Sequence, residues 1–288
     1  MKILMLHTQK TGGVAIHVSE ILNELRKRNF SVDEITRDDD LKIDSFAQSY
    51  FKLKKLGKKW SKDYDLIHAH DWSIVYPLLR GGVKNVVATF HALPTNPLAR
   101  IFQDYCIKKL GKNAIVISPK MHRRYTSATL INNGVNLTFF KKLRGHRDAT
   151  LVGMAQQYNK NHIVKTVATT GLHWIFTDGA LPFDKIPEFY AKIGTFVSIP
   201  YKEAGFNMVW LEAMACEVPY IIGTTAGIGE VLPIYKVKDF VELNNILVKI
   251  KNKELEPLKN LRKWITKNGF VWPKNAKKLI ELYERAIE

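Results

Sequence analysis

The sequence has little cysteine and no long apolar run. Its two cysteines among 288 residues, Cys106 and Cys216, stand in apolar surroundings without the spacing of a metal or redox pair. They predict buried free thiols in the reducing cytoplasm. No apolar run approaches the roughly 18 residues that span a bilayer. Met1 leads into KILMLH without the charged region and cleavage site of a signal peptide, so we expect neither a membrane span nor a secretory leader.

Acidic residues are scarce relative to basic ones, and the imbalance is uneven. The net charge is +17, and residues 1–145 hold 25 Lys and Arg against 12 Asp and Glu. Such charge favours anionic partners, which include nucleic acid, anionic lipid and phosphorylated small molecules. The densest basic run, KLKKLGKKWSK, is preceded by Phe51 and contains Trp60. The stretch 51–62 therefore fits a helix lying on an anionic membrane, or an ordinary solvated helix face.

Short apolar segments alternate with segments of helical periodicity along the chain. Strands are predicted at KILML, FSVDEI, DLIHAH, NVVATF, NAIVIS and ATLINNG, and then at TLVGM, LHWIFT, TFVSIP and PYIIGT. Helices are predicted between them, including 46–62 and 161–171. Strands separated by helices imply right-handed crossovers and parallel sheets. The polar stretch 141–149 divides the chain into predicted domains 1–145 and 150–272.

This order of elements predicts the fold class. It is α/β, with two Rossmann-like, doubly wound parallel-sheet domains facing across a cleft. In such folds ligands bind outside the carboxyl ends of the strands. The functional residues are therefore expected where strands end and the following helices begin.

One glutamate stands where acidic residues are rare. Glu212 lies in NMVWLEAMAC, which is apolar all round and predicts a buried helix. Burying a lone carboxylate costs on the order of several kcal/mol, so Glu212 needs hydrogen-bond partners. With Asn207 as N-cap, the free N–H groups of 205–209 could bind a diphosphate, and Glu212 could bind the ribose hydroxyls. The alternative is a structural glutamate satisfied by a lysine or a backbone amide.

The segment KEAGFNMVWLEAMACEVPYIIGTTAGIGEVL, at 202–232, resembles the donor-nucleotide region of retaining glycosyltransferases of GT-B fold and family 4 type (glycosyl transferases group 1). The likeness extends along nearly the whole chain. Its other parts are TGGVAIHVSEILNELRKRNFSV, YDLIHAHDW, VVATFHALP, AIVISPKMHRRY and INNGVNLTFF. WPKNAKKLIELYERA resembles the final helix of that family, so residues 273–288 are expected to cross back onto the first domain.

The resemblance implies a transferase that moves a sugar from a nucleotide-sugar, UDP- or GDP-linked, to a glycan, a lipid-linked acceptor or a small molecule. The anomeric configuration would be retained, and neither metal nor cofactor would be needed. The implied catalytic residues are His91 and Glu203 at the sugar and Lys160 at the diphosphate. The implied donor-binding residues are Gly12, Gly13, Gly205, Phe206, Asn207, Met208, Glu212 and Gly227.

Histidines raise a separate question of metal binding. His68 and His70 share one face of a predicted strand, and with Asp71 they suggest a metal site. No further ligand follows at convincing spacing, so we interpret both histidines as structural and expect no metal.

Two positions depart from the family pattern. Ala204 stands where the family has its first glutamate, with Glu203 one residue early, and Met154 replaces an arginine. These departures, and a short segment at 150–187, favour one alternative: a catalytically degenerate GT-B protein that binds a nucleotide or sugar without transfer. The charge of +17 suggests a second alternative, which is a nucleic-acid-binding protein. The sequence contains no recognised nucleic-acid-binding motif, so we expect no nucleic-acid partner. A sugar-nucleotide epimerase of the same fold is the third alternative. We expect a cytoplasmic protein, and 51–62 is its candidate segment for peripheral membrane contact, with a solvated helix face as the alternative.

Overall fold

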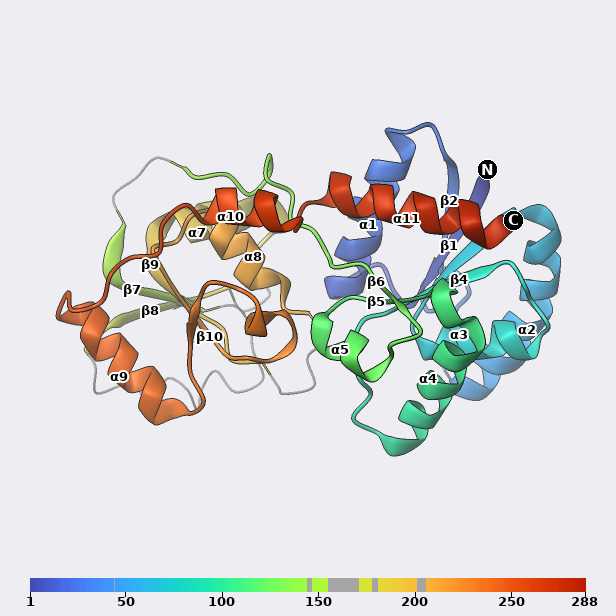
Figure 1. The fold of residues 1–288 in the computed structure, drawn as a ribbon, viewed down its shortest axis with the longest axis horizontal. Coiled ribbons are helices and arrows are strands. Elements are labelled where there is room, and N and C mark those ends of the chain that lie inside the picture. Colours follow the sequence, from blue (N-terminus) through green and yellow to red (C-terminus); the bar gives the residue numbers. More distant parts are fainter. Residues whose placement is uncertain (44, 144–146, 155–170, 178–180, 201–205) are drawn as a thin grey trace. The chain divides into compact units, whose positions relative to one another are not determined.

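The fold is described from a computed structural model, which covers the chain except residues 44, 144–146, 155–170, 178–180 and 201–205. The chain divides into two compact units (Figure 1). Unit 1 comprises 1–133 and 272–288, and unit 2 comprises 134–271.

The boundary lies earlier than the sequence predicts, because residues 134–145 belong to unit 2 and not to the first domain. Two contacts explain the difference. Val135 pairs with Val271, and its N–H donates to the carbonyl of Phe270 at 3.0 Å. Phe140 is 4% exposed and packs in the core of unit 2.

Unit 1 is built on a six-stranded sheet whose described pairings are all parallel, in the order β2-β1-β3-β4-β5-β6. Every residue of β3 and β4 is buried, as a parallel sheet covered on both faces requires. The strands are β1 (Lys2–His7), β2 (Ser31–Thr36), β3 (Leu66–His70), β4 (Val86–Phe90), β5 (Ala114–Val116) and β6 (Thr129–Leu130).

The helices of unit 1 cover both faces of this sheet. Right-handed crossovers place α1 on one face and α2, α3 and α4 on the other. Helix α11 packs against α1, β3 and β4, so the C-terminal segment returns to unit 1 (Figure 1). The helices are α1 (Gly12–Arg26), α2 (Phe46–Asp63), α3 (Trp72–Arg80), α4 (Pro97–Leu110), the 3-10 turn η1 (Gly111–Asn113), α5 (Pro119–Arg124) and α11 (Trp272–Ile287).

Unit 2 contains a second parallel sheet, in the order β11-β10-β9-β7-β8. The strands are β7 (Asp148–Met154), β8 (His173–Phe176), β9 (Ile193–Val197), β10 (Tyr220–Gly223) and β11 (Tyr235–Lys236). The helices are η3 (Phe183–Lys185), α7 (Ile186–Lys192), α8 (Met208–Ala215), η4 (Gly227–Glu230), α9 (Phe240–Lys251) and α10 (Leu261–Asn268). Two apolar clusters, one containing Trp210 and the other Leu243, make up its core.

Most predicted elements are present, and the two-sheet α/β fold is confirmed. The helix predicted at 161–171 falls mostly outside the described residues. Cys106 and Cys216 are buried free thiols, and burial raises the pKa of each to about 12. Within the described part of the chain, no helix is both long and apolar enough to cross a membrane.

Candidate active site

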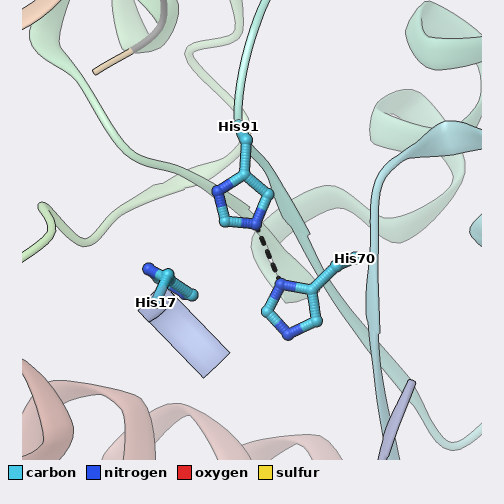
Figure 2. A group of neighbouring side chains, drawn as sticks. All are labelled: His17, His70 and His91. Carbon is cyan, nitrogen blue, oxygen red and sulfur yellow. Dashed lines mark hydrogen bonds between the residues drawn. The ribbon is translucent and has the colours of Figure 1, made fainter. Parts of the chain in front are cut away.

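Five histidines of unit 1 gather where the strands of its sheet end. His7 closes β1 and His91 follows β4, while His68 and His70 stand at the end of β3. His17 reaches them from α1, with its ring centroid 4.7 Å from that of His91 and 5.5 Å from that of His70. Figure 2 shows these three rings facing one another. The carboxyl ends of parallel strands meet at one edge of a sheet, which explains why distant segments contribute to one cluster.

Hydrogen bonds orient the three rings. Nδ1 of His70 lies 2.9 Å from Nε2 of His91, so one ring donates to the other (Figure 2). Nδ1 of His17 lies 2.8 Å from the amide oxygen of Asn133 and therefore donates to it. The opposite nitrogen, Nε2 of His17, is buried and has no partner among the described residues. Leaving a buried polar atom unsatisfied costs about 1–3 kcal/mol, so this nitrogen would gain from a ligand or a water.

Burial keeps His17, His70 and His91 uncharged at neutral pH. Desolvation lowers the pKa of His17 and of His70 well below its usual value. The pKa of His91 falls to about 3, through desolvation first and then the nearby His7. His91 is only half-buried, whereas His17 and His70 are buried. A neutral, accessible imidazole can bind a sugar hydroxyl without carrying charge at neutral pH.

His68 has a different role from the other members of the cluster. Its Nδ1 lies 2.6 Å from the hydroxyl of Tyr283, and its Nε2 lies 2.8 Å from the hydroxyl of Thr89. Both ring nitrogens are thus satisfied within the protein, and one bond ties β3 to α11. This geometry agrees with the structural interpretation of His68. His70 differs, because it bonds His91 directly.

Three of the histidines are placed so that they could share a metal ion. The nitrogens offered by His17, His70 and His91 all lie within 4.8 Å of one another. Sequence reasoning considered only His68, His70 and Asp71 and missed this trio. In the structure, Nδ1 of His70 and Nε2 of His91 are already bonded to each other. Metal independence therefore stays a prediction for experiment.

Asp71 is a further candidate, which sequence reasoning considered only as a metal ligand beside His68 and His70. It has φ of 68°, in the left-handed region that costs a non-glycine residue about 1–3 kcal/mol. Its Oδ1 accepts the N–H of His91 at 3.4 Å. Burial raises its pKa to about 6, while the His91 N–H and the charge of Arg37 act in the opposite direction. A strained, perturbed carboxyl beside His91 makes Asp71 a candidate functional residue. The available signal was an aspartate directly after a buried strand.

Gly12 and Gly13 form the first turn of α1. Gly12 has φ of 84°, which favours glycine. A Cβ built on Gly13 would meet nothing within 4 Å. Thr11 occupies the N-cap position without a side-chain cap bond, so its hydroxyl leaves the first N–H groups of the helix uncapped. The open space beside these N–H groups could admit an anionic group.

In unit 2, Glu212 lies buried in α8, with 5% of its surface exposed. The hydroxyl of Tyr190 donates to its Oε2 at 3.0 Å. Desolvation raises the pKa of Glu212 to about 7, although the Tyr190 bond lowers it. The carboxylate is therefore only partly compensated by the residues that the structure describes. It is neither a fully satisfied structural group nor an exposed one.

The N-terminus of α8 lies where the sequence predicts it. Asn207 occupies the N-cap position, but its side chain donates to Oγ of Ser198 at 2.7 Å and makes no cap bond. Phe206 packs partly buried against the core, and Met208 begins the helix. The predicted N-cap position of Asn207 is confirmed, and the N–H groups at this end are not capped by its amide.

The other predicted donor-site residues have mixed outcomes. Gly227 begins η4 with φ of 54°, which favours glycine. Lys160, Glu203 and Gly205 lie outside the described residues. The described candidates fall into two groups, one in each unit. Gly12, Gly13 and His91 belong to unit 1, and Phe206, Asn207, Met208, Glu212 and Gly227 belong to unit 2.

Comparison with family models gives one match in each half of the chain. Residues 11–139 match the model described as Glycosyltransferase Family 4. Residues 135–254 match the model described as Glycosyl transferases group 1. A curated relative, the glycosyltransferase MJ1178 of Methanocaldococcus jannaschii, is 25% identical over 357 residues, covering 99% of this chain and 98% of its own.

Solved structures share the fold. The Anabaena protein Alr3699/HepE, crystallised with UDP, has a TM-score of 0.73 and 14% identity, and the match covers 99% of this chain and 100% of that one. The S. aureus protein MnaA, also solved with UDP, has a TM-score of 0.60 and 10% identity, with 97% and 95% covered. MurG of Acinetobacter baumannii has a TM-score of 0.59 and 10% identity, with 99% and 100% covered.

Proposed function

Since the chain is a glycosyltransferase of GT-B fold and family 4 type, we propose that it transfers a sugar from a UDP- or GDP-sugar to a glycan or lipid-linked acceptor. We further propose that it retains the anomeric configuration and uses neither metal nor cofactor. Two solved neighbours hold UDP, which makes UDP-sugars the first donors to test. We assign the protein to the cytoplasm, with peripheral contact between residues 51–62 and an anionic membrane.

The observation that carries the proposal is the buried carboxylate of Glu212 one turn inside α8. Its raised pKa of about 7 shows how incompletely its surroundings replace water. Two ribose hydroxyls would donate to this carboxylate and offset that deficit. The N-terminus of α8, at Asn207 and Met208, would bind the diphosphate, because a helix N-terminus favours anions.

The sugar and the acceptor are assigned mainly to unit 1. His91 is a half-buried ring and is held in place by His70. It would donate or accept a hydrogen bond at the transferred sugar. Asp71, bonded to the backbone of His91, would position that residue. Lys160 and Glu203 keep their proposed roles at the diphosphate and at the sugar.

Departure of a nucleoside diphosphate leaves negative charge on its phosphates as the glycosidic bond breaks. Preorganised N–H groups stabilise such charge, and one donor contributes about 10²–10³-fold in rate. Met154 is buried at the end of β7 in place of a cationic side chain. Stabilisation of the leaving group therefore falls to the N–H groups of α8 and to Lys160.

Calorimetric titration with UDP, GDP and ADP in EDTA tests the donor site. We expect one nucleotide to bind and its affinity to weaken by about 1–3 kcal/mol in Glu212→Gln. The matched control is Glu217→Gln. Glu217 follows the opposite end of the same helix and pairs with Lys142 at 3.3 Å, so its loss should leave affinity unchanged. Equal binding by wild type and Glu212→Gln would make Glu212 structural.

The degenerate alternative predicts the same nucleotide binding without turnover. Release of nucleoside diphosphate from a nucleotide-sugar, measured with the same protein preparation, separates the two. Binding without release on a panel of glycan and lipid acceptors would favour the degenerate protein.

A further inference from the structure

The outer side of α2 and α4 carries apolar side chains that the core does not cover. Phe51 on α2 is 72% exposed, and Leu98 and Ile101 on α4 are 59% and 63% exposed. Isolated exposed apolar residues are ordinary on protein surfaces. A contiguous group of them usually marks an interaction site.

Ring contacts join aromatic side chains of α2, α3 and α4, and Leu98 and Ile101 stand one helical turn before Phe102 and Tyr105 on α4. On α2, Phe51 packs against Tyr50, with ring centroids 5.3 Å apart. Tyr50 contacts Tyr76 of α3 at 6.0 Å. Tyr76 in turn contacts Phe102 and Tyr105 of α4 at 4.7 and 5.5 Å. We call this the aromatic surface; it comprises Tyr50, Phe51, Tyr76, Leu98, Ile101, Phe102 and Tyr105.

The helices that carry the aromatic surface are strongly basic. The ranges 46–63, 72–80 and 97–110 together hold ten Lys and Arg and two acidic residues, Asp63 and Asp104. Asp104 is already bonded by Arg124 at 3.2 Å and by the hydroxyl of Tyr125 at 2.6 Å. The net field over these helices therefore attracts anions.

Four lysines of α2 continue the aromatic surface as a stripe. Phe51, Lys55, Lys58, Lys59 and Lys62 follow at the spacing that places them on one face of a helix. The four lysines line a surface hollow of about 610 Å³. Gly81, Gly82 and Val83, which follow α3, also line it. An open hollow with several ammonium groups suits a phosphate-bearing head group.

We propose that the aromatic surface and the lysine stripe together dock this protein on an anionic phospholipid bilayer. Phe51, Leu98 and Ile101 would enter the head-group layer, while the lysines keep their ammonium groups among the lipid phosphates. The lysine hollow takes one such phosphate. The inference deepens the proposed function and rests on it in one respect, since a lipid-linked acceptor would be presented at this surface.

Lipid is favoured over the other anionic partners because the charge and the apolar rings share one surface. Nucleic acid would use the lysines and stack bases on aromatic rings, but it would gain little from the aliphatic Leu98 and Ile101. An anionic bilayer uses both kinds of side chain. Competition by an oligonucleotide is therefore included as an outcome of the test.

The test is flotation of the whole protein with vesicles of phosphatidylcholine alone or with 30% phosphatidylglycerol. We expect binding to the anionic vesicles only, weakened by 0.5 M salt. The triple variant Lys55→Gln, Lys58→Gln, Lys59→Gln should bind about 100-fold less tightly, at roughly fivefold per lysine. Phe51→Ser should lose about tenfold and retain the salt dependence.

The matched control is Lys274→Gln, Lys277→Gln, Lys278→Gln on α11, which removes the same charge from exposed lysines elsewhere in unit 1. It should bind vesicles as the wild type does. An equal loss of vesicle affinity in both triple variants would overturn the proposal, because net charge alone would then explain the binding. Displacement of the vesicles by equimolar oligonucleotide, or a dimer by light scattering that Phe51→Ser abolishes, would overturn it too.

Nucleotide titration on the same variants separates this proposal from the previous one. The triple variants and Phe51→Ser should bind UDP or GDP as the wild type does, because none of them alters α8. Vesicle binding without nucleotide binding would refute the donor site and leave the docking surface standing. Nucleotide binding without vesicle binding would refute the docking surface and support the donor site.

Discussion

The raised pKa of Glu212 predicts that donor affinity depends on pH. With a folded-state pKa of about 7, the carboxyl group is roughly one-tenth ionised at pH 6 and nine-tenths ionised at pH 8. Two ribose hydroxyls donate best to the ionised form. Affinity for the donor should therefore rise about tenfold from pH 6 to pH 8, which corresponds to about 1.4 kcal/mol.

The assay is calorimetry with an intact nucleotide-sugar, because its diphosphate bears no proton that titrates in this range. Titrations in two buffers of different ionisation enthalpy would also detect the proton that Glu212 releases on binding. Glu212→Gln should bind weakly and without pH dependence. The same tenfold rise in Glu212→Gln, or a flat profile in the wild type, would refute a ribose role for this carboxylate.

The same pKa fixes the sign of a stability effect. The folded-state pKa of Glu212 lies above its ordinary value of 4.5, so the folded protein binds the proton more tightly than the unfolded chain. The stability that protonated Glu212 contributes to the folded state is fully present below pH 4.5 and is lost as the pH rises through about 7. Relative to Glu212→Gln, the wild type should therefore lose about 3 kcal/mol of unfolding free energy between pH 4.5 and pH 8. Urea denaturation of both proteins at the two pH values measures this difference.

Other predictions concern single contacts. His91→Ala should lower kcat/KM for transfer by about 10²-fold and leave nucleotide affinity unchanged, whereas a parallel loss of nucleotide affinity would contradict the assignment to the sugar. Gly229→Ala should destabilise the protein by about 1–3 kcal/mol in denaturant melts, because the added Cβ would overlap the carbonyl oxygen of Thr224 and the ring of Trp210. An unchanged stability would contradict this packing. Transfer should continue in EDTA and no metal should copurify; stoichiometric zinc that is lost in His17→Gln would contradict metal independence.

The sequence predicts the parallel sheets well because each buried strand is a short apolar run. β3 and β4 are examples in which every residue is buried. Strand β11 was missed because only Tyr235 and Lys236 form it, too few for a periodic signal. The domain boundary was placed late because the polarity of 141–149 suggests a linker, whereas the pairing of Val135 with Val271 assigns the preceding residues to unit 2.

The candidate site was predictable in part. Glu212 stands out in the sequence because one carboxylate interrupts an apolar helix, and its burial is confirmed. The contact of His17 with His91 could not be predicted from the sequence, because it depends on how α1 crosses the sheet. The left-handed backbone of Asp71 has no signal in residue type, since aspartate adopts that conformation only in particular turns.

The most direct test of the central claim is release of nucleoside diphosphate from UDP- and GDP-sugars in EDTA, with the product glycoside analysed by NMR. The account predicts that one donor is consumed without metal, that an α-linked donor gives an α-linked product, and that Glu212→Gln is slow while Glu217→Gln is normal. Absence of release from any donor, despite tight nucleotide binding, would contradict transfer by this protein. An inverted product, or a strict requirement for a divalent metal, would contradict the proposed mechanism.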